Sequence, residues 1–181
     1  MNYAKLTEIF EAQKVLMHKY HDIEVSNGVP DVPIGPLDFN LRDRQMRFRL
    51  TTHWTIEECV EAVEADPENL ASELSDILHF MTEAAIYAGV TPAHFQFHES
   101  RQNPNPMHLV IILGRATNLM KAKPWKQTLK PWTLQNQTLL ERYVREAYEF
   151  LLEHISSQGL DAHEIYFQKN EVNHERIQTQ Y

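Results

Sequence analysis

The sequence contains one cysteine, five glycines and no long hydrophobic run. Cys59 has no partner for an internal disulfide and no Cys/His cluster around it, which excludes a disulfide scaffold and a zinc ribbon. The longest apolar stretches, such as residues 109–113, fall far short of the ~20 residues that cross a bilayer. The amino terminus also has no basic segment followed by an apolar one. We therefore expect a cytoplasmic protein without a membrane partner.

The sequence also has fewer basic than acidic residues. The chain has 17 Lys and Arg against 25 Asp and Glu, a formal net charge of -8. Binding to long nucleic acid depends on neutralising phosphates with basic side chains, so this balance argues against such a partner. A small phosphorylated ligand held through metal ions remains compatible with the charge.

The apolar spacing is helical nearly throughout. With 181 residues, 43% of them hydrophobic, the chain can bury roughly two thirds of its unfolded surface in one domain, 1–181. Three prolines and two glycines between 25 and 38 predict a loop, and no useful alternating strand pattern occurs. The predicted fold is an all-α bundle, with a short helix starting at Thr91. The other helices are predicted at about 3–24, 39–65, 68–89, 107–121, 134–157 and 161–178.

Two of these helices are expected to form an antiparallel hairpin. The joint runs from Ala65 to Asn69, where Asp66 is placed to cap a helix and Pro67 to occupy its first position. Such a short joint requires the helices at 39–65 and 68–89 to pack side by side in opposite directions.

Four carboxylates mark this hairpin. Glu58 and Glu61 are three residues apart on the first helix, and Glu73 and Asp76 are three apart on the second, so each pair shares a helix face. If the hairpin brings the pairs together, their repulsion suits hard cations with oxygen ligands, which describes magnesium or manganese.

A plainer interpretation of the first pair stays open. On a helical wheel Ile56, Val60 and Val63 define the apolar arc, and the two glutamates lie nearly opposite it, as solvated side chains would. The second pair instead flanks the apolar arc of its own helix, where it can line a cleft.

The last predicted helix has a face of hydrogen-bond donors. Lys169, Asn173 and Arg176 are spaced four and three apart, so an ammonium, an amide and a guanidinium lie on one side. Such a row matches phosphate oxygens. The alternative is a solvated helix end whose basic residues complement the helix dipole.

These segments resemble a known superfamily. Glu58-Cys-Val-Glu61 and Glu73-Leu-Ser-Asp76-Ile-Leu-His-Phe80 resemble the ExxE and ExxD motifs of the all-α nucleoside triphosphate pyrophosphatases, which include MazG and the dimeric dUTPases. The tail from Lys169 to Tyr181 resembles the KNxxNxxRxxxxY signature of dimeric dUTPases and of the phage dCTPase-dUTPase. The resemblance implies a bundle of the MazG and dimeric dUTPase type that hydrolyses a deoxynucleoside triphosphate to its monophosphate and pyrophosphate, in nucleotide-pool control.

The resemblance also assigns roles to residues. It implies that the four carboxylates hold two or more Mg²⁺ ions, with Mn²⁺ as a substitute, and that Glu61 is the favoured base for the attacking water. It implies a homodimer or a tetramer, in the host cytoplasm if the source is a phage. The residues expected to contact the triphosphate are Lys169, Asn170, Asn173, Arg176 and Tyr181.

The base specificity is less defined. Gln13-Lys-Val-Leu16 resembles the base-reading segment of the family, but Met17 stands where dUTPases usually have Asn. Resemblance therefore ranks dUTP first, while the thioether of Met17 favours a purine substrate (dATP or dGTP), and dCTP stays open.

A cationic and aromatic segment follows at 114–132. We expect an insert at about 99–133 to be mobile and to close over the nucleotide, with base-binding or lid roles for Lys121, Lys123, Trp125 and Lys126. A surface loop pinned by two tryptophans is the alternative. His79, one turn past Asp76, is expected to be a packed or solvated side chain and not a metal ligand.

A different class of function also fits the helices. The chain could be a binding or scaffold protein that keeps the fold without catalysis, although the presence of all four carboxylates disfavours this alternative.

Overall fold

The computed structural model describes residues 1–95, 106–123, 125, 127 and 129–179. Within these residues it contains six α-helices, one 3-10 helix and no strand, which confirms the predicted all-α class. The helices are α1 (Tyr3–Ser26), α2 (Arg42–Glu64), α3 (Leu70–Ala88), η1 (Pro92–His94), α4 (Pro106–Leu119), α5 (Leu134–Ser157) and α6 (Ala162–Thr179).

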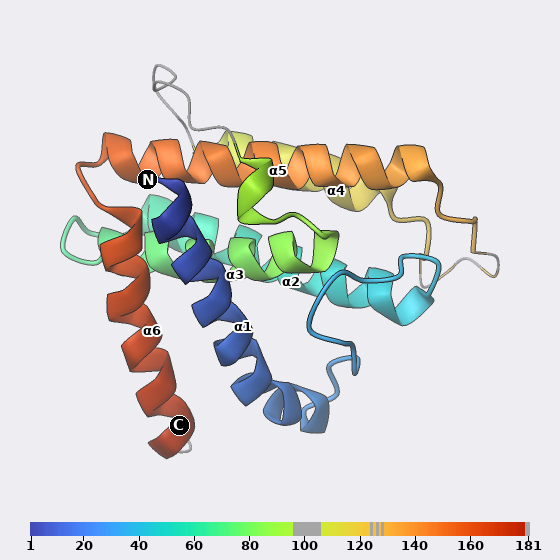
Figure 1. Cartoon of the computed structure of the whole chain (residues 1–181), viewed down its shortest axis with the longest axis horizontal. Coiled ribbons are helices and arrows are strands. Elements are labelled where there is room, and N and C mark those ends of the chain that lie inside the picture. The colour runs from blue at the N-terminus through green and yellow to red at the C-terminus, as the bar shows by residue number, and fades with distance from the viewer. Residues whose placement is uncertain (96–105, 124, 126, 128, 180–181) are drawn as a thin grey trace.

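Helix α3 lies at the centre of the molecule. It packs against α2, α5, α6 and α1. Figure 1 shows α4 and α5 on one side of the α2–α3 hairpin and α1 and α6 on the other. Because neighbours surround it, 13 of its 19 residues are buried, and polar side chains along it are therefore enclosed.

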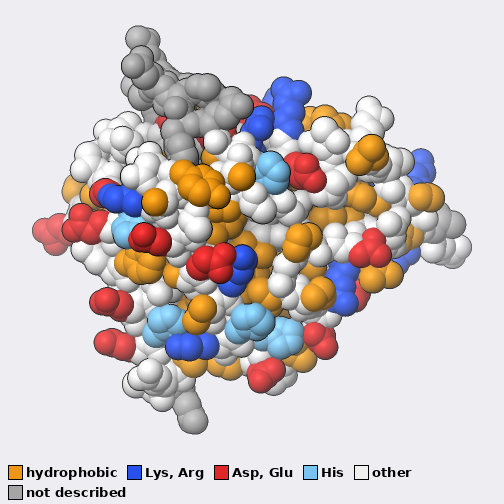
Figure 2. Space-filling view, in the orientation of Figure 1, with side chains coloured by type: hydrophobic (Ala, Val, Ile, Leu, Met, Phe, Trp, Pro, Cys, Tyr) orange, Lys and Arg blue, Asp and Glu red, His pale blue; other side chains and the backbone are white. Residues whose placement is uncertain are grey.

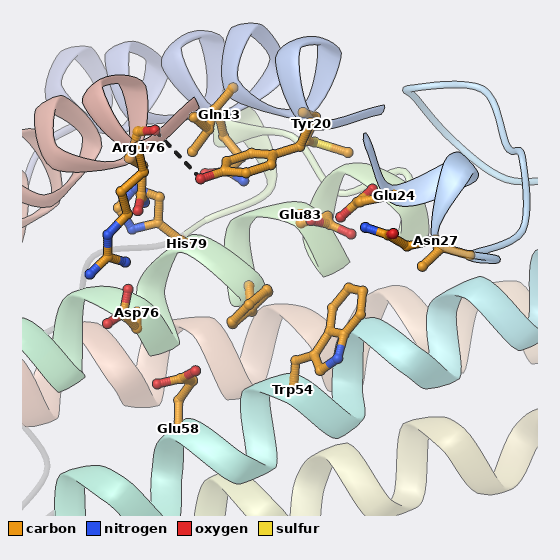
Figure 3. Close-up of a pocket in the computed structure, with 15 residues that line it drawn as sticks. Gln13, Tyr20, Glu24, Asn27, Trp54, Glu58, Asp76, His79, Glu83 and Arg176 are labelled. Atoms are coloured by element: carbon orange, nitrogen blue, oxygen red, sulfur yellow. Dashed lines mark hydrogen bonds between the residues drawn. The ribbon is translucent and has the colours of Figure 1, made fainter. Parts of the chain in front are cut away.

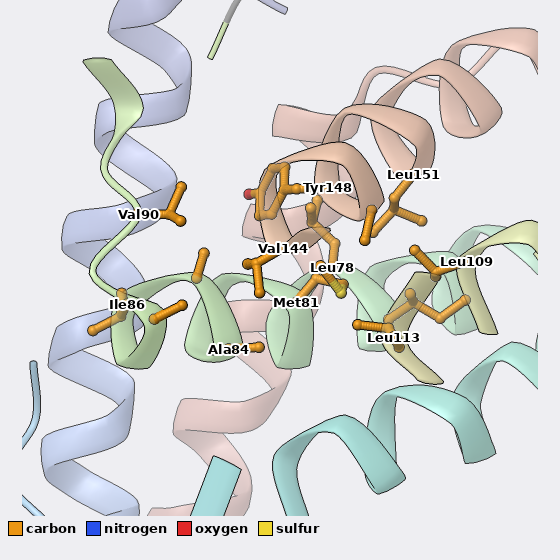
Figure 4. Packing of buried hydrophobic residues seen from close by; sticks show 14 of the residues in the cluster. Leu78, Met81, Ala84, Ile86, Val90, Leu109, Leu113, Val144, Tyr148 and Leu151 are labelled. Carbon is orange, nitrogen blue, oxygen red and sulfur yellow. The ribbon is translucent and has the colours of Figure 1, made fainter. Parts of the chain in front are cut away.

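The core forms where α3 meets α5 and α4. Leu78 and Met81 of α3 pack beside Val144 and Leu151 of α5 (Figure 4), and all four are at most 2% exposed. Burying a side chain of this size contributes about 1.5–3 kcal/mol each. The hydroxyl of Tyr148 lies 2.9 Å from Oγ1 of Thr82, so this polar group is satisfied inside the core.

The joint of the hairpin differs from the prediction. Residues 66–69 form a turn in which the amides of Asn69 and Leu70 donate to the carbonyl of Asp66, at 2.9 and 3.1 Å. Helix α3 begins only at Leu70, so the placement of Pro67 at its first position was wrong. At its other end Gly89 has φ 80°, a left-handed conformation that glycine adopts without strain and that ends the helix where predicted.

The buried face of α2 also differs from the helical wheel. Val60 and Val63 are 49% and 59% exposed, whereas Thr55, Cys59 and Ala62 are buried. Threonine can be buried here because its hydroxyl is satisfied within the helix; Oγ1 of Thr55, for example, donates to the carbonyl at position 51. A scale of hydrophobicity alone therefore selected the wrong side of α2.

The surface mixes all kinds of side chain. On the described face that Figure 2 presents, Lys and Arg are scattered among acidic and hydrophobic groups and are not gathered in one stripe. None of the described helices is long and apolar enough to cross a membrane.

Candidate active site

Three carboxylates of the α2–α3 hairpin lie within reach of one cation. One oxygen each of Glu58, Glu73 and Asp76 lies within 4.8 Å of the other two, and all three side chains are half-buried. The short joint and the i, i+3 spacing bring them together, because both helix faces turn toward the same side of the hairpin. Glu61 is exposed and lies outside this set.

The electrostatics of this cluster favour a bound cation. Burial, followed by the charges of Asp76, Glu61 and Glu73, raises the pKa of Glu58 to about 7. Burial also raises the pKa of Glu73 and of Asp76 above their usual values, and Glu61 adds to both shifts. Repelling carboxylates with converging oxygens fit a hard divalent ion such as Mg²⁺ or Mn²⁺.

Helix α6 places a lysine directly on this cluster. Nζ of Lys169 donates to a carboxylate oxygen of Asp76 and, at 2.9 Å, to the hydroxyl of Ser72. The ammonium lowers the pKa of Glu58, Glu73 and Asp76, but burial and mutual repulsion outweigh it. The predicted phosphate-binding helix therefore meets the predicted metal-binding hairpin.

The remaining donors predicted in the C-terminal segment differ in their positions. Asn173 and Arg176 line a pocket next to the carboxylates, and the charge of Arg176 lowers the pKa of Asp76. Asn170 is only 6% exposed, and its Oδ1 is buried with no hydrogen-bond partner among the described residues. Tyr181 lies outside the described residues.

The pocket extends from the carboxylates along α1. Its volume is about 500 Å³, a size typical of small-molecule sites. Figure 3 shows Glu58, Asp76 and Arg176 toward one end, and Glu24, Glu83 and Asn27 toward the other. The lining residues are Gln13, Leu16, Met17, Tyr20, Glu24, Asn27, Val29, Trp54, Glu58, Asp76, His79, Phe80, Glu83, Asn173 and Arg176.

The middle of this pocket offers flat apolar surface and an amide. The rings of Trp54 and Phe80 pack together with centroids 5.5 Å apart. Gln13 and Met17, which the sequence singled out for base binding, both line the pocket. The hydroxyl of Tyr166 donates to Oε1 of Gln13 at 2.8 Å, so the amide nitrogen of Gln13 stays available to a ligand.

Sequence reasoning missed the far end of the pocket. Nη2 of Arg47 donates to Glu24 at 2.7 Å and to Glu83 at 3.0 Å, and Nε donates to the hydroxyl of Tyr87 at 3.1 Å. Burial raises the pKa of Glu83 to about 6, although Arg47 opposes this. The signal was present, because Glu83 is the one acidic residue between Ile77 and Ala88 in the apolar α3.

His79 is packed, as the sequence predicted, and it also lines the pocket. Its Nδ1 lies 2.8 Å from the carbonyl of Ser75, which accepts only if Nδ1 carries the proton. Its ring stacks on Tyr166 at 4.1 Å, and its Nε2 is buried without a partner among the described residues. Burial lowers the pKa of His79 to about 4, so the ring is neutral and Nε2 is an acceptor.

Three of the four predicted lid residues belong to the described part of the chain, and they do not line the pocket. Among the residues that the structure describes, Lys121, Lys123 and Trp125 do not line the pocket, and Trp125 is 77% exposed. Nζ of Lys121 donates to the carbonyl of Asn118 at 2.8 Å. Within the predicted insert 99–133, residues 106–119 form α4, which packs on α5 and α2. Lys126 and residues 96–105 lie outside the described residues.

Comparison with known proteins identifies the family of the chain. A family model described as dUTPase matches residues 53–181, which is more than half of the chain and includes all four carboxylates and α6. Searches of curated proteins and of solved structures give no significant match. Helix α1, with its pocket residues, lies outside the matched range. The chain belongs to this family of dUTPase-like nucleotide hydrolases.

Proposed function

We propose that the protein hydrolyses a deoxynucleoside triphosphate at the α-phosphorus and releases the monophosphate and pyrophosphate. The convergence of Glu58, Glu73 and Asp76 within 4.8 Å carries this proposal. Lys169 on the cluster and Arg176 in the adjoining pocket support it, because they offer cationic donors beside the carboxylates. The pocket beyond them has room and apolar walls for a sugar and a base.

In the proposed reaction the oxygen of a water molecule bonds to the α-phosphorus while the bond from that phosphorus to the α–β bridging oxygen breaks. Bound Mg²⁺, or Mn²⁺ in its place, neutralises the triphosphate and lowers the pKa of the attacking water; the donor set would hold two or more ions. Glu61 is the proposed acceptor of the water proton. It is exposed at the edge of the cluster, where a carboxylate can take a proton and return it to solvent.

The α6 donors would stabilise the charge that develops on the departing pyrophosphate. Fixed ammonium and guanidinium groups are most effective where charge grows in the transition state. Lys169 and Arg176 are proposed for this role, with Asn173, Asn170 and Tyr181 as further phosphate contacts.

Membership of the family makes dUTP the first substrate to test, and dCTP, dATP and dGTP the alternatives. Each triphosphate is incubated with the protein and Mg²⁺, and the products are separated. We expect monophosphate and pyrophosphate in equal amounts, and none after chelation. Orthophosphate as the first product, or turnover unaffected by chelation, would contradict the proposal.

A non-catalytic scaffold of the same fold is the second candidate. The convergence of three half-buried carboxylates disfavours it, because a scaffold without a bound cation would have to bear their mutual repulsion. Calorimetric titration with Mn²⁺ separates the two functions, since a scaffold would show no saturable divalent-ion site.

We also propose that the protein is a homodimer or a tetramer. Val60 and Val63 on α2, and Met107 and Ile111 on α4, are about half exposed on two helices that pack together. These side chains, on neighbouring helices, offer the apolar surface that an interface with a second copy would bury. Sedimentation of the wild type and of Val60→Glu is the test: we expect an oligomer that the substitution weakens, and a monomeric wild type would contradict it. We also propose that Lys121, Lys123, Trp125 and Lys126 form a lid over a nucleotide bound in such an assembly.

A further inference from the structure

The far end of the pocket holds more negative charge than its own cation balances. Glu24 and Glu83 both bind the single guanidinium of Arg47, which is 3% exposed and does not line the pocket. Two carboxylates against one guanidinium leave a net negative charge in this wall, where the side chain of Glu83 is 6% exposed and that of Glu24 is 24% exposed. Such an excess is costly unless something in the pocket compensates for it.

Each carboxylate keeps one oxygen for a ligand. Arg47 and Thr51 both donate to Oε1 of Glu83, and Arg47 donates to Oε2 of Glu24. In the described part of the chain no hydrogen bond ends on Oε2 of Glu83 or on Oε1 of Glu24. Since both residues line the pocket and Glu83 is only 5% exposed, this end offers hydrogen-bond acceptors of fixed orientation.

His79 is an independent observation that points the same way. Its Nε2 is a buried acceptor without a partner among the described residues, on a ring that lines the same pocket. An unpartnered buried acceptor is compensated when a ligand donates to it. The acceptors of His79 and Glu83 on α3 and of Glu24 on α1 would therefore be complemented by a ligand that carries N–H or O–H groups.

Gln13 also gives the pocket an oriented donor. Because Oε1 of Gln13 accepts from Tyr166, the amide nitrogen of Gln13 is the part left for the ligand, where a carbonyl oxygen would complement it.

We propose that this pocket selects nucleotides whose base carries both an amino group and a carbonyl oxygen, namely cytosine or guanine, over those with uracil or thymine. The amino group donates to the free oxygens of Glu83 and Glu24, and the carbonyl accepts from Gln13. This inference rests on the proposed function, because it concerns the base of the proposed substrate.

Uracil fits such a wall poorly for a physical reason. Its only ring donor, N3–H, lies between two carbonyl oxygens, and these oxygens repel carboxylates. In cytosine the 4-carbonyl is replaced by an amino group, and in guanine the amino group and N1–H are adjacent donors. A site whose charged acceptors are left unpaired by the wrong base discriminates by roughly tenfold to a hundredfold or more.

Two pairs of substrates isolate this contact. dCTP and dUTP differ at position 4 of the base, and dGTP and dITP differ only in the 2-amino group. With the full-length protein and Mg²⁺, we expect kcat/KM to favour dCTP over dUTP and dGTP over dITP by roughly tenfold or more. A dCTP/dUTP ratio at or below one overturns the inference.

Substitution of Glu83 sharpens the test. Glu83→Gln keeps the shape of the side chain but adds an N–H₂ donor that can serve O4 of uracil, so we expect the dCTP/dUTP ratio to fall by roughly tenfold. Glu149→Gln is the matched control, because Glu149 is also largely buried and pairs with an arginine, at 3.8 Å, but does not line the pocket. A Glu83→Gln ratio equal to that of the control overturns the role of Glu83; if this variant does not fold, the wild-type ratios decide alone.

Failure of this inference is distinguishable from failure of the proposed function. If dUTP has the highest kcat/KM of the triphosphates tested, the proposed hydrolysis is supported and the proposed base specificity is contradicted. If no triphosphate is hydrolysed, the proposed function falls, and thermal stabilisation of the protein by dCTP against dUTP still measures the base preference. Equal stabilisation by the two nucleotides then overturns the inference as well.

Discussion

The two ends of the pocket hold clustered carboxylates in different ways. At one end Glu58, Glu73 and Asp76 converge on each other, with Lys169 as their nearest cation. At the other end Glu83 and Glu24 are separated by Arg47, which binds both. In the first arrangement the uncompensated charge points at a common centre, which suits a metal ion. In the second it is divided between two fixed acceptors, which suits a hydrogen-bonding ligand.

The largest expected effect is on turnover at the metal end. Glu58→Gln or Asp76→Asn removes a ligand oxygen charge, and we expect metal-dependent hydrolysis to fall by roughly a hundredfold to a thousandfold. The fold should persist, and the apo protein should melt no lower, because a repulsion is relieved. The exposed Glu57, next to Glu58 but on another face of α2, provides Glu57→Gln as a control with wild-type rates. Wild-type rates of hydrolysis in Glu58→Gln or in Asp76→Asn would contradict the assignment of a metal site to this end of the pocket.

The second prediction concerns stability at the Arg47 end. Arg47→Met leaves two carboxylates in a buried wall without their cation, and we expect unfolding in urea to show a loss of about 3–5 kcal/mol. The control is Arg145→Met, whose side chain is 40% exposed and pairs with Glu149 at 3.8 Å; its loss should stay below about 1 kcal/mol. Equal losses of unfolding free energy in the two variants would contradict the interpretation that Arg47 compensates two enclosed carboxylates.

The third prediction tests the proposed phosphate donor beside the carboxylates, at the metal end of the pocket. Arg176→Ala should weaken triphosphate binding and slow hydrolysis by roughly tenfold to a hundredfold, because a charged donor to phosphate is lost. Glu175→Ala should have little effect, since Glu175 is exposed and does not line the pocket. Isothermal titration with a non-hydrolysable triphosphate gives the comparison, and similar affinities of the two variants would refute the face assignment.

The smallest expected effect is a pH dependence at the metal end. Between 4.5 and about 7 the folded protein keeps a proton on Glu58 that the unfolded chain releases, so this residue lowers stability progressively as pH rises through that window. The shifted pKa values of His79 and Glu83 act in overlapping ranges, so the difference between Glu58→Gln and the wild type is the informative quantity.

Melting in EDTA measures that difference. The advantage of Glu58→Gln in Tm should grow from about pH 5 to about pH 8. Saturating Mg²⁺ should reverse it, because only the wild type retains the full set of carboxylates. A difference that is independent of pH would mean that Glu58 does not titrate in the folded protein as its surroundings require.

The positions of the helices followed closely from the sequence, with differences at helix ends such as the starts of α2 and α3, which were predicted at 39 and 68 and lie at Arg42 and Leu70. Proline, glycine and capping residues act locally, so Gly89 marked a helix end that the structure confirms. The structure at Asp66 and Pro67 was harder to predict, because these two residues are compatible both with a helix start and with a turn. In the folded hairpin they form a turn.

The buried side of α2 could not be predicted from hydrophobicity. Val60 and Val63 are more apolar than Thr55 and Cys59, yet the latter two are buried. Helix α2 packs on α3, and the hydroxyl of Thr55 is satisfied inside its own helix. The sequence pattern of α2 therefore contained two candidate faces, and contact with α3 decided between them.

The sequence by itself determined the all-α class, the order of the helices and the spacing that puts two carboxylates on each face of the hairpin, because these depend on neighbours three and four residues apart. Tertiary structure decided which of the four carboxylates share one centre, and it placed Lys169 upon them. It alone brought Glu24, Arg47 and Glu83 together from three helices, since no local pattern links residues that far apart in the chain. Glu24 and Glu83, which are proposed to determine base specificity, belong to this group. A pocket wall is built from long-range contacts, whereas each pair of metal-binding carboxylates lies within a single helix turn.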